Sequence, residues 1–182
     1  MTTALVIIDM QMAMLHRIEA GRDHVNPDAP ARIAALAAAF RQAGRPVVHI
    51  RHRDVDPASA FHPQAPGYAP MPCAQDVENE PVFLKTTSSG FASTDLAAWL
   101  RAAGIEDLLV TGAVAGFCVN STVRAGADLG FRMQVARDAV LGFDMPDAHL
   151  SARTIFDVTM AHLAADFAKV VDTADVLAAE VV

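Results

Sequence analysis

The segment Ala4–Ile8, with the sequence ALVII, is a short apolar run that ends abruptly at the acidic residue Asp9. It lacks alternating polar residues, which is typical of a strand buried on both faces. Further strand-like segments, most of them equally apolar, are Pro46–Ile50, Val82–Leu84, Leu108–Thr111, Met133–Ala136 and Lys169–Val171. The pattern predicts six strands in a mostly parallel sheet that is covered on both faces.

The residues between these strands have helical patterns. In Ala31–Ala43, apolar residues recur at i, i+3, i+4 and i+7, which gives one apolar face, and Gly44 then supplies a stop signal. Further helices are predicted over Thr94–Ala103, Phe117–Leu129 and Asp147–Phe167. Strands that alternate with helices favour right-handed crossovers and a parallel sheet. We therefore expect a single domain over residues 1–182, a three-layer α/β/α sandwich of the Rossmann-like kind.

One connection in this pattern is unusually long. The segment Asp54–Pro81 contains six prolines and little helical periodicity. Long loops inside a compact domain are usually functional or mobile, although a bland insertion is the alternative.

Composition narrows the classes of function. The chain has 14 basic and 21 acidic residues and a formal charge of −7, which disfavours a phosphate-binding surface for nucleic acid. Its 53% of hydrophobic residues excludes a disordered chain. The longest apolar run, Ile33–Phe40, is far shorter than the ~20 residues of a membrane-spanning helix. We expect no nucleic-acid or membrane partner.

The sequence also bears on the compartment. The apolar run at the beginning has no basic leader, and the two cysteines, Cys73 and Cys118, form no disulfide framework. We therefore expect a reducing, cytoplasmic setting.

Three chemically distinct side chains follow the ends of strands. Asp9 follows the first strand, Lys85 follows Val82–Leu84, and Cys118 lies near the start of a helix after Leu108–Thr111. Ligands of open parallel sheets bind beyond the carboxyl ends of the strands, so we expect the three side chains to converge. Taken singly, each has a non-catalytic alternative. Asp9 could cap a turn, Lys85 could be a solvated loop residue, and Cys118 could be an inert core cysteine.

Two observations favour a catalytic role for Lys85 and Cys118 over these alternatives. The chain has two lysines against twelve arginines, which suggests that Lys85 is kept where a compact point charge is needed. The start of a helix also lowers the pKa of a thiol, so we expect a thiolate at Cys118.

The combination suits nucleophilic acyl transfer. Cys118 would attack a carbonyl carbon, Asp9 would take and return the proton, and Lys85 would hold both groups in place. Backbone N–H groups of the turn Gly112–Cys118 would stabilise an oxyanion. Neither a G-x-S-x-G motif nor a nucleotide-binding glycine motif occurs at the matching positions.

Three segments resemble the isochorismatase-like cysteine hydrolases: Leu5–Gln11, Phe83–Lys85 with Ser89–Leu96, and Val110–Val119. The likeness extends over almost the whole chain. It implies a catalytic triad of Asp9, Lys85 and Cys118 and a six-stranded parallel sheet flanked by helices. It also implies a cis peptide bond between Ala113 and Val114, which would aim the Val114 N–H at the oxyanion, and a homo-oligomer, a dimer or a tetramer.

The chain departs from the family pattern in two places. Ala115–Gly116 stands where relatives commonly carry threonine and a polar residue, which puts the substrate in doubt and suggests open space near Cys118. The nicotinamidase branch carries an Asp-x-His metal motif after the second strand, and the segment Arg51–Asp56 lacks that order. His52, Asp54, Asp56 and His62 could still meet a cation, but we expect no metal and no cofactor.

Positions near the strand ends suggest contacts with a small-molecule substrate. Gln11 could bind a polar group, three phenylalanines could form an apolar wall, and two basic residues could bind a carboxylate. The alternatives are a surface amide, core packing and a solvated turn. These candidates are Gln11, Phe91, Phe117, Phe143, Arg51 and His52.

Together, these features predict a metal-independent cysteine hydrolase that cleaves a C–N bond in an amide, carbamoyl or ureido group through a thioester on Cys118. A vinyl-ether hydrolase of the isochorismatase type is the first alternative, in which an acid protonates the substrate and the thiol is dispensable. A protein without hydrolytic activity, either a redox-responsive thiol protein or a scaffold, is the second.

Overall fold

The strand-like segments pair into one sheet in the computed structural model, which describes residues 2–180. Six strands run parallel: β1 (Thr3–Ile8), β3 (Val47–His52), β4 (Val82–Lys85), β5 (Asp107–Ala113), β6 (Arg132–Phe143) and β7 (Lys169–Val171). A seventh, β2 (His24–Val25), is antiparallel to the end of β6. The predicted mostly parallel sheet is confirmed, with β2, which is too short to produce a sequence pattern, as an addition.

Within residues 2–180, five α-helices lie between strands: α1 (Met12–Glu19), α2 (Ala29–Gln42), α3 (Leu96–Ala102), α4 (Asn120–Asp128) and α5 (Ala152–Asp166). A sixth, α6 (Thr173–Glu180), follows β7. Helices α1 and α6 were not predicted from the sequence, since eight residues show barely two turns of periodicity. Short 3₁₀ turns lie at Pro72–Ala74 and Pro146–Ala148. None of the helices in residues 2–180 is long and apolar enough to cross a membrane.

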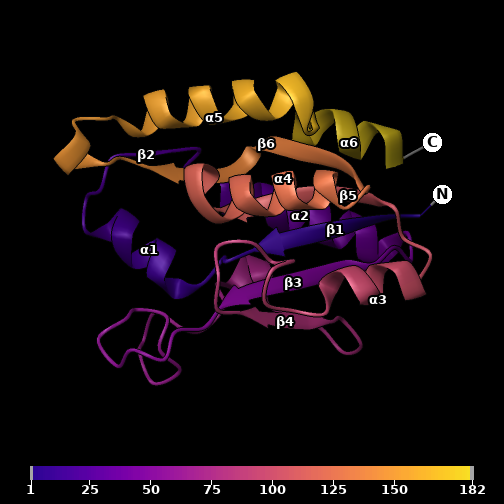
Figure 1. The fold of residues 1–182 in the computed structure, drawn as a ribbon, viewed down its shortest axis with the longest axis horizontal. Helices are drawn as coiled ribbons and strands as arrows, with labels where there is room; N and C mark the ends of the chain where they lie inside the picture. Colours follow the sequence, from indigo (N-terminus) through magenta and orange to yellow (C-terminus); the bar gives the residue numbers. More distant parts are fainter. Residues whose placement is uncertain (1, 181–182) are drawn as a thin grey trace.

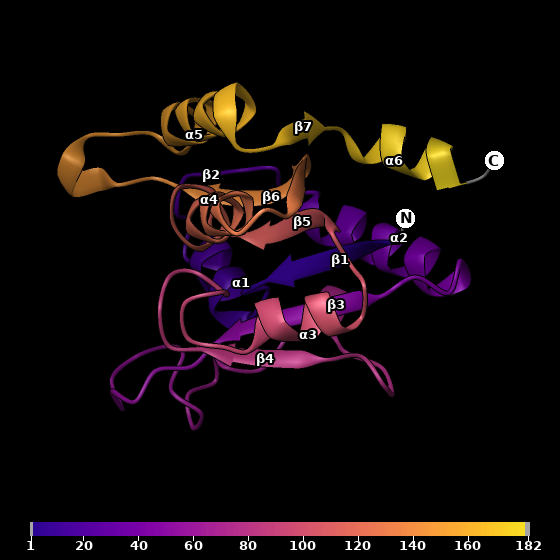
Figure 2. The same cartoon turned by 45° about the vertical axis from the view of Figure 1, so that its right-hand side comes forward.

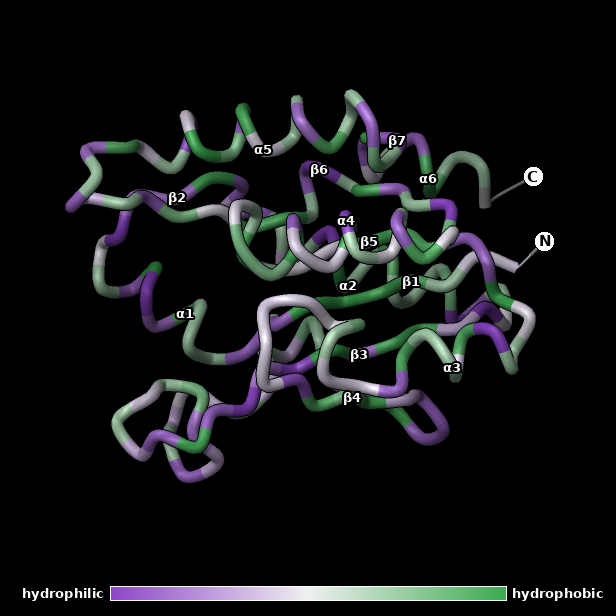
Figure 3. The backbone as a smooth tube through the Cα atoms, in the orientation of Figure 1, coloured by the Kyte–Doolittle hydropathy of each residue, from purple (hydrophilic) through white to green (hydrophobic). Residues whose placement is uncertain are grey.

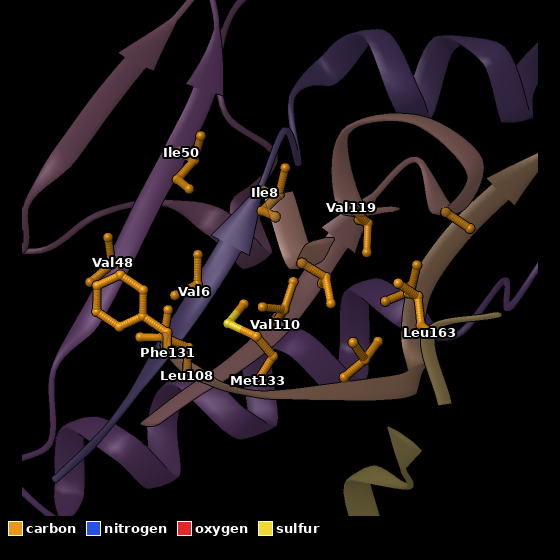
Figure 4. Close-up of a cluster of buried hydrophobic side chains, with 14 of the residues drawn as sticks. Val6, Ile8, Val48, Ile50, Leu108, Val110, Val119, Phe131, Met133 and Leu163 are labelled. Atoms are coloured by element: carbon orange, nitrogen blue, oxygen red, sulfur yellow. The ribbon is translucent and has the colours of Figure 1, made fainter. Parts of the chain in front are cut away.

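Successive residues of β1 point to opposite faces of the sheet. Ala4, Val6 and Ile8 belong to a cluster with side chains of α3, α4 and α5, part of which Figure 4 shows. Leu5 and Ile7 belong to the other cluster, which includes side chains of α1 and α2. Figure 1 shows α3 and α4 in front of the sheet and α2 behind it. The predicted three-layer α/β/α arrangement is confirmed.

The order of the strands places a topological switch between β1 and β5. The sheet runs β2-β6-β5-β1-β3-β4, so the chain passes from β1 to β3 and β4 and then returns to the other side of β1. Figure 2 shows the arrows of β1, β3, β4 and β5 pointing toward the same side. Ligand sites of doubly wound sheets lie outside the carboxyl ends of the strands at such a switch. Asp9 follows one of the two strands at the switch, and Cys118 follows the other.

The long loop between β3 and β4 is attached to the beginning of α1. Backbone N–H groups of Met12 and Ala13 donate to the carbonyls of Ala69 (2.8 Å) and Gly67 (2.9 Å). Helices leave their first N–H groups without partners inside the helix, so the loop supplies acceptors that α1 needs. Figure 3 shows this loop with mixed hydropathy beside the apolar central strands.

Gly112 is where β5 approaches β1 most closely. Its φ is 115°, and a Cβ there would overlap the Ile8 backbone, with the Ile8 nitrogen only 2.6 Å away. Any side chain at this position pushes the two strands apart. Since the segment after Gly112 carries Cys118, this glycine also fixes the start of the turn that holds the thiol.

We predict that Gly112→Ala lowers the free energy of unfolding by about 3 kcal/mol or more, because a positive φ and an overpacked contact both oppose the methyl group. Urea denaturation followed by circular dichroism measures the change. Gly130→Ala is the matched control: Gly130 has φ 89°, but a Cβ there meets nothing within 4 Å. The control should lose only about 1–2 kcal/mol. Equal losses in the two variants would contradict the close approach at Gly112.

Candidate active site

The Lys85 ammonium lies at the centre of a polar cluster at the switch. Its Nζ is 2.7 Å from Asp9 Oδ2, 3.2 Å from Cys118 Sγ and 2.9 Å from His52 Nδ1. These residues follow or end β1, β5, β3 and β4. The Lys85 side chain is completely buried, and that of Asp9 is 3% exposed. The predicted convergence of Asp9, Lys85 and Cys118 therefore occurs in the structure, with His52 as a fourth member.

Asp9 turns the chain away from the sheet directly after β1. Its φ is 50°, a left-handed conformation that aspartate tolerates better than most residues. The Asp9 N–H still donates to the Ile50 carbonyl (2.8 Å), which extends the pairing with β3 by one residue. Within residues 2–180, its second oxygen, Oδ1, is buried and has no hydrogen-bond partner. Asp9 thus has one oxygen on Lys85 and another that is not committed.

Cys118 lies in a π-helical turn, Ala115–Val119, which leads directly into α4. The Val114 carbonyl accepts from the N–H groups of Phe117 (3.0 Å) and Val119 (3.3 Å), which closes the turn. The peptide bond between Ala113 and Val114 is cis. Single π-helical turns are frequent at functional sites.

The ionisation of the site differs from the prediction. Burial raises the pKa of Cys118 to about 12, and the negative charge of Asp9 adds to this effect, while Lys85 opposes it. The expected thiolate is therefore wrong for the resting site, because burial outweighs the position near a helix start. Burial also raises the pKa of Asp9, against the opposing effect of Lys85. Burial thus raises the pKa of both the Cys118 thiol and the Asp9 carboxyl group.

His52 remains an uncharged acceptor in this cluster. Burial and the charge of Lys85 lower the pKa of the His52 imidazole. Its Nδ1 accepts from Lys85, and its ring packs edge-on against Phe61, with 5.1 Å between the ring centroids. His52 thus helps to hold the ammonium in place.

Gln11 has a different role from the predicted substrate contact. It is completely buried, and its Nε2 donates to the carbonyls of His52 (3.1 Å) and Tyr68 (2.8 Å). Its Oε1 accepts from the His52 N–H at 2.8 Å. Because both ends of the amide are bonded to backbone groups, Gln11 fixes the end of β3 and leaves nothing for a ligand.

A cavity of about 270 Å³ opens on the cluster. It is lined by Asp9, Met14, Arg17, His52, Phe61, Ser88, Val114, Phe117 and Cys118. Its size is just below the range of about 300–1,000 Å³ that is usual for small-molecule sites. Of the predicted contacts, Phe117 and His52 line it.

A second hollow of about 510 Å³ adjoins the first. The two share Arg17, Val114 and Phe117, and the second one also reaches Phe143. Phe143 therefore lies next to the site but does not line the cavity that contains Cys118.

Two predicted contacts lie elsewhere. Arg51 is paired with Asp76 at 2.5 Å, so its charge is used in the loop before β4. Phe91 stacks on Phe131, with 5.4 Å between the ring centroids, and packs against the core cluster that includes α3, α4 and α5. Neither lines the cavity.

Met14, Arg17 and Ser88 line the cavity but were not among the predicted contacts. Met14 and Arg17 lie on α1, which the sequence analysis did not recognise as a helix. Met14 and Ile18, four residues apart, were the available signal for an apolar face of such a helix.

The departure at Ala115–Gly116 does not open space near the thiol. Ala115 is fully buried in the core cluster that contains Val6 and Ile8. A Cβ on Gly116 would be 3.0 Å from Ile155 Cγ2, so position 116 faces α5 rather than the cavity. The expectation of open space near Cys118 at these positions is therefore wrong.

Asp9, His52 and Cys118 also present potential metal-ligand atoms within 4.8 Å of one another. The Lys85 ammonium is within 3.2 Å of an atom of each, so the chain itself supplies the cation between them. Asp54 and Asp56 instead accept backbone N–H groups of Asp56 (3.1 Å) and Ala58 (2.9 Å), in turns of the long loop.

Comparison with known proteins agrees with this geometry. Residues 3–175 match the model of the isochorismatase domain. The isochorismatase family protein YrdC of Bacillus subtilis is 31% identical over 173 residues, which cover 93% of this chain and 91% of that protein. The streptothricin hydrolase of Streptomyces noursei is 35% identical over 148 residues, which cover 80% of this chain and 51% of that enzyme.

Solved structures give the same result. A crystal structure of an isochorismatase-family protein from Chromobacterium violaceum superimposes with a TM-score of 0.92 at 36% sequence identity. The match covers 98% of this chain and 93% of the other. From the family model, the relatives and the fold together, the chain belongs to the isochorismatase family.

Proposed function

We propose that this isochorismatase-family hydrolase is a metal-independent cysteine hydrolase that cleaves the C–N bond of a small amide, carbamoyl or ureido compound. The observation that carries the proposal is the Lys85 ammonium, held 2.7 Å from Asp9 Oδ2 and 3.2 Å from Cys118 Sγ beside a cavity. A base, a cation and a nucleophile in contact are the parts that covalent acyl transfer needs. The streptothricin hydrolase among the relatives supports hydrolysis as the reaction type.

In the first half-reaction, the Asp9 carboxylate takes the proton of the Cys118 thiol as Sγ attacks the carbonyl carbon of the substrate. The C–S bond forms, and the carbonyl oxygen becomes an oxyanion. When the oxyanion collapses, the C–N bond breaks and Asp9 returns its proton to the leaving nitrogen. An amine or ammonia departs, and a thioester remains on Cys118.

In the second half-reaction, Asp9 takes a proton from a water molecule as the water oxygen attacks the thioester carbon. The C–S bond breaks, and the proton on Asp9 returns to the sulfur. The sum is the addition of one water molecule across the C–N bond. The Lys85 ammonium stabilises first the Asp9 carboxylate and then the developing thiolate.

The raised pKa of Asp9 suits this cycle. A general base works best when its pKa approaches the working pH, and burial moves the Asp9 carboxyl in that direction. Val114 and Cys118 both line the cavity, and their backbone N–H groups are our candidates for binding the oxyanion.

We predict that the wild-type protein releases ammonia from at least one member of a panel of small primary amides, carbamoyl compounds and ureides. In Cys118→Ala, kcat/KM for that compound should fall by a factor of about 10⁴ or more, since the covalent route is lost. A coupled assay for ammonia measures the rate.

Cys73→Ala is the matched control, because Cys73 is the second cysteine and does not line the cavity. It should retain the wild-type rate. Equal cleavage of isochorismate by the wild type and by Cys118→Ala, without ammonia release from any compound, would instead establish vinyl-ether hydrolysis.

We further predict that Asp9→Asn abolishes hydrolysis yet makes Cys118 more reactive. The Asp9 charge helps to raise the pKa of this thiol, so its removal lowers that pKa, and the buried ammonium then pairs with the thiolate. Alkylation of Cys118 by iodoacetamide at pH 7.5 should become about tenfold faster, which corresponds to a fall of one pKa unit.

Peptide mass spectrometry after timed alkylation measures this rate for each cysteine separately. Burial raises the pKa of Cys73 to about 11, independently of Asp9, so its rate should not change and serves as the internal reference. Slower alkylation of Cys118 in Asp9→Asn would show that the carboxylate already activates the thiol in the resting site.

A further inference from the structure

Arg17 lies in the last turn of α1 and lines the cavity that contains Cys118. It also lines the adjoining hollow, so the residue borders both. The side chain is half-buried, and its guanidinium carbon is 5.8 Å from the centre of the Phe143 ring. An aromatic ring beside a guanidinium helps to fix the orientation of the guanidinium.

Arg17 has no acidic partner in the part of the chain that the structure describes. Within residues 2–180 it forms no ion pair, although most arginines of this chain do so. The nearby Arg22 is paired with Asp144 at 2.7 Å, and the carboxylate of Asp9 is taken by Lys85. A half-buried cation without an anion has given up part of its hydration without the usual compensation.

The charges around the cavity consequently do not balance. Asp9 contributes one negative charge, and Lys85 and Arg17 contribute one positive charge each. Cys118 and His52 are neutral, because burial raises the pKa of the thiol and lowers that of the imidazole. Moving the thiol proton to Asp9 leaves this sum unchanged. The site therefore carries one positive charge in excess, in a protein whose formal charge is −7.

We infer that Arg17 binds an anionic group of the substrate, so that the preferred substrates are amides, carbamoyl compounds or ureides that carry a carboxylate. This inference rests on the proposed function for the identity of the cleaved bond. Arginine suits this role because its planar fork matches the two oxygens of a carboxylate. The carboxylate would lie toward the shared wall of the two hollows, and the scissile carbonyl would lie toward Cys118.

A basic residue in the last turn of a helix can also serve only to balance the helix dipole. His16, the neighbouring basic residue in this turn, is exposed and is free to play that part. Arg17 instead is half-buried and lines the cavity that contains Cys118, which balancing the helix dipole does not require.

The test uses two alkylating probes of nearly equal size that differ in charge: iodoacetate, which carries a negative carboxylate, and iodoacetamide, which is neutral. Each forms an S–C bond to the Cys118 thiolate and releases iodide. Because both react with the same thiolate, the ratio of their rates is independent of the pKa of the thiol. The ratio therefore reports how strongly the cavity attracts a carboxylate, whether or not a substrate is known.

In the wild type, we expect the ratio of the iodoacetate rate to the iodoacetamide rate to be higher at Cys118 than at Cys73 in the same sample. Arg17→Met keeps the apolar stem beside Phe143 and removes the charge. It should lower the ratio at Cys118 about fivefold, the upper end of what a partly exposed ion pair contributes. Arg17→Lys should restore most of the ratio, and the ratio at Cys73 should not change.

Arg22→Met is the control for long-range charge, since it removes a nearby positive charge that does not line the cavity of Cys118. It should leave the ratio within about twofold of the wild type, because Arg22 is exposed and already paired with Asp144, and exposed ion pairs contribute little. An unchanged ratio in Arg17→Met, or an equal fall in Arg22→Met, would overturn the inference. Absence of ammonia release from every compound would overturn the proposed function alone, since alkylation does not require turnover.

Discussion

The ion pair between Lys85 and Asp9 is the interaction on which the site depends. Burial of two charges is costly, and removal of either partner would leave an uncompensated charge in the interior. Lys85 ends β4 and Asp9 follows β1, and these strands are separated by β3. Neighbouring strands lie about 4.8 Å apart, so the backbones of β1 and β4 are separated by about 10 Å. The long Lys85 side chain, the short Asp9 side chain and the 2.7 Å contact between them bridge this gap together. The pair thereby connects the ends of β1 and β4, and Lys85 also contacts His52 at the end of β3.

The same pair decides the chemistry of the thiol. Asp9 raises the pKa of Cys118 and Lys85 lowers it, with burial tipping the balance toward the neutral thiol. In the proposed mechanism, attack by sulfur is therefore coupled to proton transfer onto Asp9 and does not begin from a thiolate already present in the resting site. Redox-sensing cysteines combine a low pKa with access to solvent, whereas burial raises the pKa of Cys118. This argues against the redox-thiol reading of the sequence and for a nucleophile that is activated only during the reaction.

The sequence was sufficient where a rule of topology applied. Six apolar segments predicted the parallel sheet, and the rule that ligands bind at the carboxyl ends of strands brought Asp9, Lys85 and Cys118 together in advance. It was insufficient where contacts cross long distances in the chain. Gln11 bonds to backbone groups of His52 and Tyr68, 41 and 57 residues away, which no local pattern indicates. Whether the pKa of Cys118 is raised or lowered likewise depends on a balance of burial and charge, which the spacing of residues in the sequence does not reveal.

Reactivity and recognition are built by different parts of the molecule. The reactive groups lie at the ends of strands, where the sheet and a buried ion pair hold them. Arg17 and Phe61 come from α1 and the long loop, which are joined through the bonds of Met12 and Ala13 to loop carbonyls. A change in the loop can thus move α1 and reshape the cavity without disturbing the sheet. Since loops accept changes more readily than central strands do, substrate choice can diverge in this fold while the reaction is retained.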